Sequence, residues 1–334
     1  MARVAPVTSL RRLSYLALAV AYAQIVFGAL VRITGSGLGC GDHWPKCNGV
    51  WFPSLDQPHL VIEVAHRYIA AALILVILAL LVSAIRRRAE PGVSGRGGIL
   101  VRAEVAAALV AAAALFGAAT VKMGLTPWVI VGHLTIAMSL LGTLASAAVR
   151  AGGLGASSLA VGSMGAKTFR AARAGAAGAL AVVVLGALTA NLPGANVACL
   201  GFPLCSKGMA AGGLGHLQLT HRILGLLLAL HVLGLAVASG KRHEPRAVVQ
   251  VARAALALVV TQILIAGAMI GMHLPPALRS MHEAIGALLW VTLVALAVLA
   301  GLASGAVGSP AVAAADPDGA RPVHAGGVAT GARA

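Results

Sequence analysis

The sequence has few charged residues, and this scarcity excludes an ordinary soluble protein. Only 10% of its 334 residues are charged, and 59% are hydrophobic, whereas about 25% of the residues of a soluble domain carry a charge. Aromatic residues are also scarce, at 4%. The abundant Ala and Gly instead suit the close approach of helices in lipid. The composition therefore predicts an integral membrane protein.

Acidic residues are the rarest charged class. Nine Asp and Glu stand against 25 Lys and Arg, which gives a formal net charge of +16. Such a charge can indicate nucleic-acid binding, but here the basic residues cluster before the first apolar stretch and after every second one. By the positive-inside rule, this alternation predicts a multi-pass plasma-membrane protein with both termini in the cytoplasm. We therefore expect contact with the lipid bilayer and no nucleic-acid partner.

Long apolar stretches are present in the number that a polytopic helical protein needs. A membrane-spanning helix requires roughly 20 apolar residues. Eight such stretches are found, at 13–32, 63–85, 100–121, 128–149, 174–191, 217–239, 248–271 and 280–303. The predicted fold class is all-α integral membrane with eight transmembrane helices. The first stretch has an internal counterpart, so we interpret it as a helix rather than a cleaved signal peptide.

The two halves of the chain repeat the same motifs. His66 and His221 each belong to a His-Arg pair, in EVAHRYIA and QLTHRILG, and are 155 residues apart. His133 and His282 follow matched Met, Leu and Pro residues and are 149 residues apart. Similar offsets from two independent motifs predict two tandem pseudo-symmetric four-helix bundles. Because each bundle has an even number of spans, the copies should be parallel.

The repeat also predicts the boundaries of the units. Residues 1–150 should form the first four-helix unit and residues 173–303 the second. Residues 151–172 are predicted to be a flexible cytoplasmic linker, because the stretch is rich in Gly and Ser. Residues 304–334 are predicted to be a disordered cytoplasmic tail.

The four histidines that recur in the repeat are the candidates for chemistry. Each lies in the first turns of an even-numbered span, so all four should sit at a similar depth near the outer face. Two imidazoles on facing helices of a four-helix bundle suit the axial positions of a haem iron. This predicts one haem between His66 and His133 and another between His221 and His282. His231 has no counterpart in the first unit, so we interpret it as a packing residue.

Arg67 and Arg222 directly follow two of the candidate ligands. Haem propionates near the outer surface need cationic partners, and a guanidinium pairs well with a carboxylate. Snorkelling of the two side chains to the lipid headgroups explains the same positions equally well. Both interpretations stay open at this point.

The two units differ at one chemically important position. Glu63 lies three residues before His66 and shares its helical face, whereas the equivalent residue, Gln218, cannot take up or release a proton. A carboxylate beside a haem can move protons during an oxidation. We therefore predict a reactive site with Glu63 in the first unit and an electron-transfer haem in the second. Glu283 adjoins His282 but faces about 100° away, so it is a candidate contact between units.

The chain has four cysteines, in two loops on the predicted outer side: Cys40 with Cys47, and Cys199 with Cys205. Because that compartment is oxidising and each loop holds its own pair, we predict two local disulfides. The first pair either staples its loop or has a redox role, and the sequence favours neither. None of the four belongs to a CxxCH haem-attachment motif.

These motifs resemble a known family. The segments GALVRITGSGLGCGDHWPKCNG, EVAHR, LTPWVIVGH, LTHR and MHEAIG are similar to the bacterial, cysteine-containing type of haem A synthase, over roughly residues 11–303. The resemblance implies oxidation of the C8 methyl of haem O to a formyl group by successive hydroxylations, for use in cytochrome oxidases. It implies that His66 and His133 hold the substrate haem O with Glu63 catalytic. It also implies that His221 and His282 ligate a haem B cofactor.

The same resemblance implies haem O synthase as a partner. It leaves the electron donor unidentified and the formation of a homo-oligomer open. The main alternative is a di-haem b-type membrane electron carrier that modifies no haem. A duplicated transporter with histidines in a proton path is the alternative without haem. The difference between Glu63 and Gln218 favours the enzyme, because a pure electron carrier has less need of it.

Overall fold

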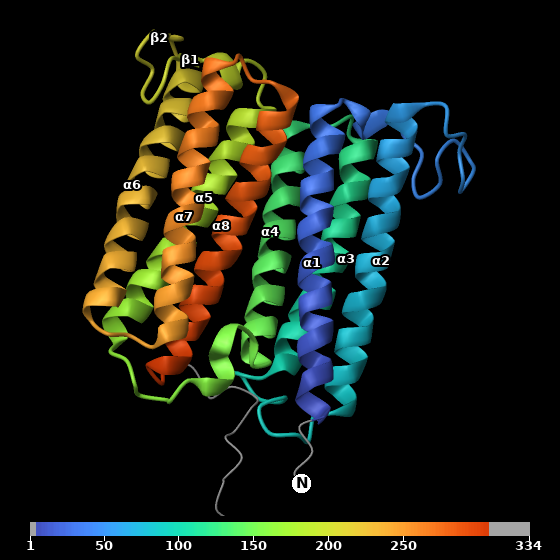
Figure 1. The fold of residues 1–334 in the computed structure, drawn as a ribbon. Helices are drawn as coiled ribbons and strands as arrows, with labels where there is room; N and C mark the ends of the chain where they lie inside the picture. The colour runs from blue at the N-terminus through green and yellow to red at the C-terminus, as the bar shows by residue number, and fades with distance from the viewer. Residues whose placement is uncertain (1–4, 307–334) are drawn as a thin grey trace, which may run out of the picture.

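The structure, a computed structural model, describes residues 5–306, and within this range it consists mainly of eight long helices joined by loops (Figure 1). The helices are α1 (Ala5–Ile33), α2 (Pro58–Arg86), α3 (Ile99–Lys122), α4 (Pro127–Arg150), α5 (Ala166–Asn191), α6 (Gly213–Lys241), α7 (Arg246–Gly271) and α8 (Pro276–Ala303). All eight are long and apolar enough to cross a membrane. The predicted all-α membrane fold is therefore confirmed.

The helices begin where local sequence signals favour a start. Pro58, Pro127 and Pro276 each occupy the first turn of a helix, where the missing N–H costs nothing and the fixed φ suits the helix. Helices α1 and α5 begin about eight residues before the predicted spans. The apolar count stops at the arginines near their starts, but arginine is a good helix former and the helices continue through it.

The helices form two four-helix units that stand side by side, α1–α4 and α5–α8, with α4 and α8 at the centre (Figure 1). Helix α8 packs against α1 and α4 of the other unit, and α4 also packs against α5. This is the predicted tandem arrangement. The two cysteine loops lie at one end of the units, called here the disulfide end, and α1 begins at the other (Figure 1).

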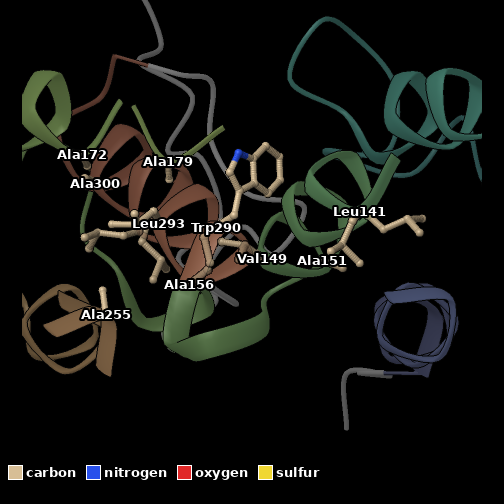
Figure 2. Close-up of a cluster of buried hydrophobic side chains, with 14 of the residues drawn as sticks. Leu141, Val149, Ala151, Ala156, Ala172, Ala179, Ala255, Trp290, Leu293 and Ala300 are labelled. Carbon is tan, nitrogen blue, oxygen red and sulfur yellow. The ribbon is translucent and has the colours of Figure 1, made fainter. Parts of the chain in front are cut away.

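The contact between the units is a buried apolar cluster (Figure 2). Trp290 and Leu293 of α8 belong to it, together with Leu141 of α4. Gly142 of α4 lies directly against Trp290, and a Cβ at this position would overlap the indole ring. The absence of a side chain at Gly142 therefore allows α4 and α8 to approach closely, as small residues do between membrane helices.

Shorter elements complete the loops. At the disulfide end, η1 (Ser36–Leu38) lies in the first loop, and the other loop contains η3 (Ala195–Val197) and a hairpin of β1 (Cys199–Leu200) with β2 (Gly208–Met209). At the opposite end, η2 (Gly153–Ser158) begins the stretch predicted as a linker.

The predicted linker is partly ordered by contacts with the first unit. Gly153 and Ala156 are buried, and the amide of Leu154 donates a hydrogen bond of 3.1 Å to the hydroxyl of Tyr15 in α1. Helix α5 starts at Ala166, inside the predicted linker. Most of the predicted tail, residues 307–334, lies outside the described residues.

Candidate functional site

One continuous cavity of about 750 Å³ lies in both units and is lined by residues of all eight helices. Its walls are mainly apolar. All four histidines of the repeat line it: His66, His133, His221 and His282. The structure therefore brings the four predicted candidates together in one space.

Glycines bring the helix backbones against the histidine rings. Gly28, Gly117 and Gly186 each face the imidazole of one repeat histidine. A Cβ on these glycines would lie 3.1, 3.3 and 2.9 Å, respectively, from the Cε1 atom of the facing ring. Any side chain would therefore crowd the ring. This explains the glycine that begins the GAL segment in both units, at Gly28 and Gly186.

His66 of α2 and His133 of α4 line the cavity in the first unit, and His221 of α6 and His282 of α8 line it in the second. The Nδ1 atoms of His66 and His133 are buried, and neither has a hydrogen-bond partner within the described part of the chain. Nδ1 of His221 lies 3.1 Å from the carbonyl oxygen of Val182. Ligation of iron by these rings stays a prediction.

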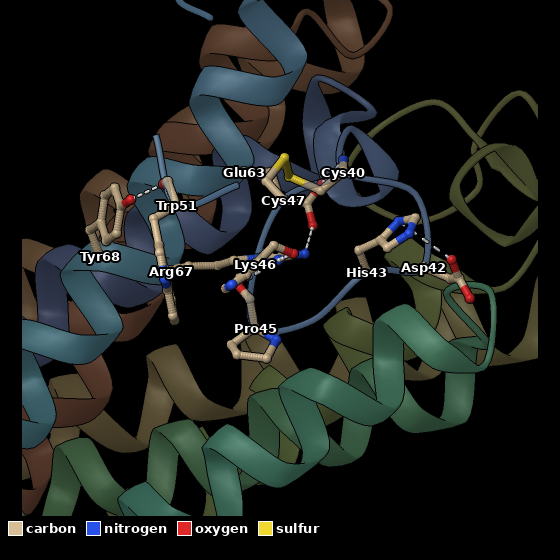
Figure 3. Close-up of a disulfide and its surroundings, with 10 residues drawn as sticks. All are labelled: Cys40, Asp42, His43, Pro45, Lys46, Cys47, Trp51, Glu63, Arg67 and Tyr68. Atoms are coloured by element: carbon tan, nitrogen blue, oxygen red, sulfur yellow. Dashed lines mark hydrogen bonds and ion pairs between the residues drawn. A yellow bond between two sulfur atoms is a disulfide. The ribbon is translucent and has the colours of Figure 1, made fainter. Parts of the chain in front are cut away.

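Glu63 is held in a fixed position beside the first disulfide loop (Figure 3). Its side chain is only 4% exposed. One carboxylate oxygen accepts a hydrogen bond of 2.8 Å from the backbone amide of Cys40. The other lies 2.5 Å from Nη2 of Arg67 in an ion pair. The carboxylate is therefore buried with a cationic partner, as a buried charge requires.

Gln218 takes the equivalent place in the second unit, but it donates a hydrogen bond to its loop, whereas Glu63 accepts one. Its side chain is buried and lines the cavity, and its Nε2 donates a hydrogen bond of 3.1 Å to the carbonyl oxygen of Asn196. Glu63 thus accepts a hydrogen bond from its loop, whereas Gln218 donates one. The structure preserves the chemical difference between the units that the sequence indicated.

The two arginines that follow the histidines hold the loops. Nη1 of Arg67 donates to the carbonyl oxygens of Pro45 and Lys46, at 3.0 and 3.1 Å. Arg222 makes the matching contacts in the second unit, with the carbonyl oxygens of Gly201 and Cys199 at 2.5 and 2.8 Å. Their predicted pairing with haem propionates stays a prediction, and the observed contacts give both residues a structural role.

Both predicted disulfides are formed, Cys40–Cys47 and Cys199–Cys205. The first fixes the loop whose Cys40 amide binds Glu63 (Figure 3). The bridge is therefore one hydrogen bond away from the candidate catalytic carboxylate. The sequence predicted both the disulfide and the role of Glu63. It did not predict the contact between them, because Cys40 and Glu63 are 23 residues apart.

We expect replacement of both Cys40 and Cys47 by Ser to lower thermal stability and turnover together. Loss of a bridge over so short a loop removes about 2–3 kcal/mol of stabilisation, and it loosens the amide that holds Glu63. Thermal melting and turnover of the purified protein measure both effects. The matched control is the double Ser variant of Cys199 and Cys205, which should lose stability but affect turnover less. Normal turnover of the first variant would leave its bridge as a staple only.

An ion pair connects the two units at the cavity. The guanidinium of Arg32 in α1 pairs with the carboxylate of Glu283 in α8, and both side chains line the cavity. Nearby, the hydroxyl of Tyr22 donates a hydrogen bond of 3.1 Å to the carbonyl oxygen of Ala284. Glu283 therefore makes the contact between units for which the sequence made it a candidate.

The remaining histidines inside the fold make ordinary contacts. Nε2 of His231 lies 2.9 Å from the carbonyl oxygen of Ala171 in its own unit, which fits the packing role. His59 and His216 are exposed and lie in the first turns of α2 and α6.

Sequence reasoning missed two residues in the cavity, Gln24 and Gln262. Nε2 of Gln24 lies 3.2 Å from Nε2 of His66. Nε2 of Gln262 lies 3.1 Å from Nδ1 of His282. A signal was available, because each is an amide within a long apolar helix, where polar residues are expensive.

Comparison with known proteins gives a consistent result. Residues 11–294 match the family model COX15-CtaA, described as cytochrome oxidase assembly protein. The chain is 28% identical over 239 residues to a heme A synthase of Geobacillus kaustophilus, which covers 67% of this chain and 70% of that protein. It is 28% identical over 223 residues to a heme A synthase of Bacillus licheniformis, covering 66% and 72%. A segment of 61 residues is 49% identical to a protoheme IX farnesyltransferase of Thermus thermophilus, covering 18% of this chain and 10% of that protein.

Proposed function

Because the chain belongs to the COX15-CtaA family of cytochrome oxidase assembly proteins, we propose that it is a haem A synthase, an oxidoreductase that converts haem O into haem A. One observation carries the proposal. Two pairs of histidines line one cavity, and among residues 5–306 a buried carboxylate lies beside only the first pair. The name of the relatives from Geobacillus kaustophilus and Bacillus licheniformis supports the same reaction.

The residues of the cavity fit a haem in each unit. The walls are mainly apolar, as a porphyrin requires, and Nδ1 of His66 and of His133 is buried with no partner among residues 5–306. In this proposal His66 and His133 hold the substrate haem O, whereas His221 and His282 hold haem B as cofactor. The bound cofactor supplies one-electron transfer.

Glu63 is the residue that we propose moves protons during the oxidation. The Cys40 amide and Arg67 fix its two oxygens, so the carboxylate keeps one orientation toward the cavity. A positioned carboxylate accepts or donates a proton as the C8 methyl of haem O becomes a formyl group by successive hydroxylations. Gln218 cannot do this, which restricts the chemistry to the first unit.

The two units are connected by the shared cavity and by the Arg32–Glu283 ion pair. Glu283 follows the proposed ligand His282 in α8 and pairs with Arg32 at the end of α1. The pair joins α1 of the first unit to α8 of the second, and both side chains line the cavity. A charged pair here stabilises a fixed spacing of the two units.

The orientation and partners follow from the same proposal. The disulfide end faces the outside, where the oxidising compartment maintains both bridges, and both termini lie in the cytoplasm by the positive-inside rule. Haem O synthase is the proposed partner that supplies the substrate. The match of 61 residues to a protoheme IX farnesyltransferase supports this partner.

The test is extraction of haem from membranes that express the protein while haem O is available. We expect a new haem that carries a formyl group, detected by its absorption spectrum and mass. Unchanged haem B and haem O would overturn the proposal in favour of a di-haem electron carrier. A purified protein without a Soret band would overturn haem binding itself.

A variant in the same assay tests the division between units. His282→Met should change the spectrum of the retained haem B more than it changes capture of haem O. The matched variant His133→Met should do the reverse. If His282→Met mainly reduces capture of haem O, the two units have been assigned in the wrong order.

A further inference from the structure

Two glutamines in the cavity each contact the ring and the backbone of one proposed ligand. The Gln24 amide, 3.2 Å from the His66 ring, also donates to the His66 carbonyl oxygen at 3.1 Å. The Gln262 amide lies 3.1 and 3.2 Å from the two ring nitrogens of His282 and donates to its carbonyl oxygen at 3.0 Å. Each carboxamide therefore reaches both the backbone and the ring of one histidine.

The first glutamine has no counterpart in the other unit. Gly28 and Gly186 occupy equivalent places against a histidine ring, 158 residues apart. The same offset relates Gln24 to Val182. At this position the second unit uses the backbone instead, because the carbonyl oxygen of Val182 lies 3.1 Å from Nδ1 of His221.

Gln262 also has no glutamine as its counterpart in the other unit, and it contacts the second histidine of its unit rather than the first. The offset of 149 residues that relates His133 to His282 also relates Ala113 to Gln262. In the first unit the ring of His133 lies against the backbone of α3 at Gly117. Each unit therefore has a glutamine beside one of its two histidines. In the first unit this is the first histidine of the repeat, His66, and in the second unit it is the second, His282.

The carboxamide oxygen of each glutamine is a buried acceptor without a partner in the described part of the chain. Oε1 of Gln24 and Oε1 of Gln262 are buried and have no hydrogen-bond partner in the described range. A histidine that ligates a metal through one ring nitrogen donates the N–H of the other, and that donor needs an acceptor. A carboxamide has both an acceptor and donors. A turn of the Gln262 amide would exchange its donor bond to the His282 carbonyl oxygen for a bond in which Oε1 accepts from the Nδ1–H of His282.

We propose that Gln24 and Gln262 are positioning residues, which set the ring orientation and basicity of His66 in the first unit and of His282 in the second. This inference rests on the proposed haem-binding function. It gives each site one ligand whose partner is a side chain that can turn. The glutamine that acts on the ligand comes from α1 in the first unit and from α7 in the second.

The experiment compares Gln262→Met with Gln262→Glu in the full chain that retains haem B. Methionine has a similar length but only a weak acceptor, its thioether sulfur, so the ligand becomes less basic and the ferric form is less favoured. A tenfold change in the ratio of ferric to ferrous affinity is a shift of about 59 mV for one electron, and we expect a rise of about this size. Glutamate is a stronger acceptor and should shift the midpoint potential in the opposite direction. Redox titration and the ferric low-spin EPR spectrum give the readouts.

The control is Gln250→Met, which makes the same substitution at an exposed position of α7. It should leave the potential and the EPR spectrum unchanged. If Gln262→Met does not fold, Gln262→Ala, which copies Ala113 of the first unit, replaces it. Haem B with a wild-type potential in the Gln262 variants would overturn the positioning role alone, whereas wild-type protein without haem would overturn the proposed function.

The Gln24 side of the proposal has its own readout. Gln24→Met should weaken binding of added haem O about tenfold, because loss of such an outer hydrogen bond typically costs 10–100-fold in affinity. The potential of haem B in the second unit should stay unchanged. A shift of that potential with unchanged haem O binding would overturn the assignment of Gln24 to the first site.

Discussion

Replacement of Glu63 by Gln should reduce formation of the formyl-bearing haem by about 10²–10⁴-fold, the usual contribution of a positioned acid or base. The substitution keeps the shape of the side chain and copies Gln218 of the second unit, so haem should remain bound. The amide cannot exchange a proton during the oxidation, and it also removes the charge that pairs with Arg67. Haem extraction measures the product, and the Soret band measures the bound haem.

The matched control is Glu104→Gln, because Glu104 is an exposed carboxylate on α3 and should tolerate the change without loss of product. A second control separates chemistry from folding. Thermal melting of Glu63→Gln should resemble that of the wild type more closely than product formation does. Full activity in Glu63→Gln would remove its catalytic role and leave the carboxylate as a support for the disulfide loop.

Replacement of Gly142 by Leu should prevent the two units from packing in their observed arrangement. The new side chain would occupy the volume of the Trp290 ring, since even a Cβ overlaps it. Overpacking of a tight core typically costs about 1–3 kcal/mol and occasionally more. Here the cost falls on the contact between α4, which carries His133, and α8, which carries His282. We expect a lower melting temperature and a disturbed spectrum of the bound haem.

The control is Gly234→Leu on α6, an exposed glycine with no neighbouring heavy atom within 4 Å of an added Cβ. A double variant is more decisive, because Trp290→Ala should make room for the new leucine. Gly142→Leu with Trp290→Ala should therefore be less destabilised than the two single changes predict, as contacting residues are non-additive. Equal melting of Gly142→Leu and the wild type would show that α4 and α8 are not held by this contact.

The sequence alone was sufficient for the architecture of this protein. Eight apolar stretches of spanning length predict eight helices, because in lipid the backbone must satisfy its hydrogen bonds within each segment. The matched offsets of His66 to His221 and of His133 to His282 predict the duplication and the parallel units. Helix starts were less predictable, since a hydropathy count stops at arginines that α1 and α5 incorporate.

The partners of the candidate residues were decided only by the tertiary structure. The sequence put Arg67 beside a proposed ligand and left propionate binding or snorkelling as its role, whereas the structure places its guanidinium on Glu63 and the first loop. The contacts of Gln24 with His66 and of Gly142 with Trp290 follow no local pattern. Each depends on how two helices distant in sequence are rotated and spaced against one another. Hydrophobicity and duplication specify which segments become helices, but only packing specifies which side chains meet.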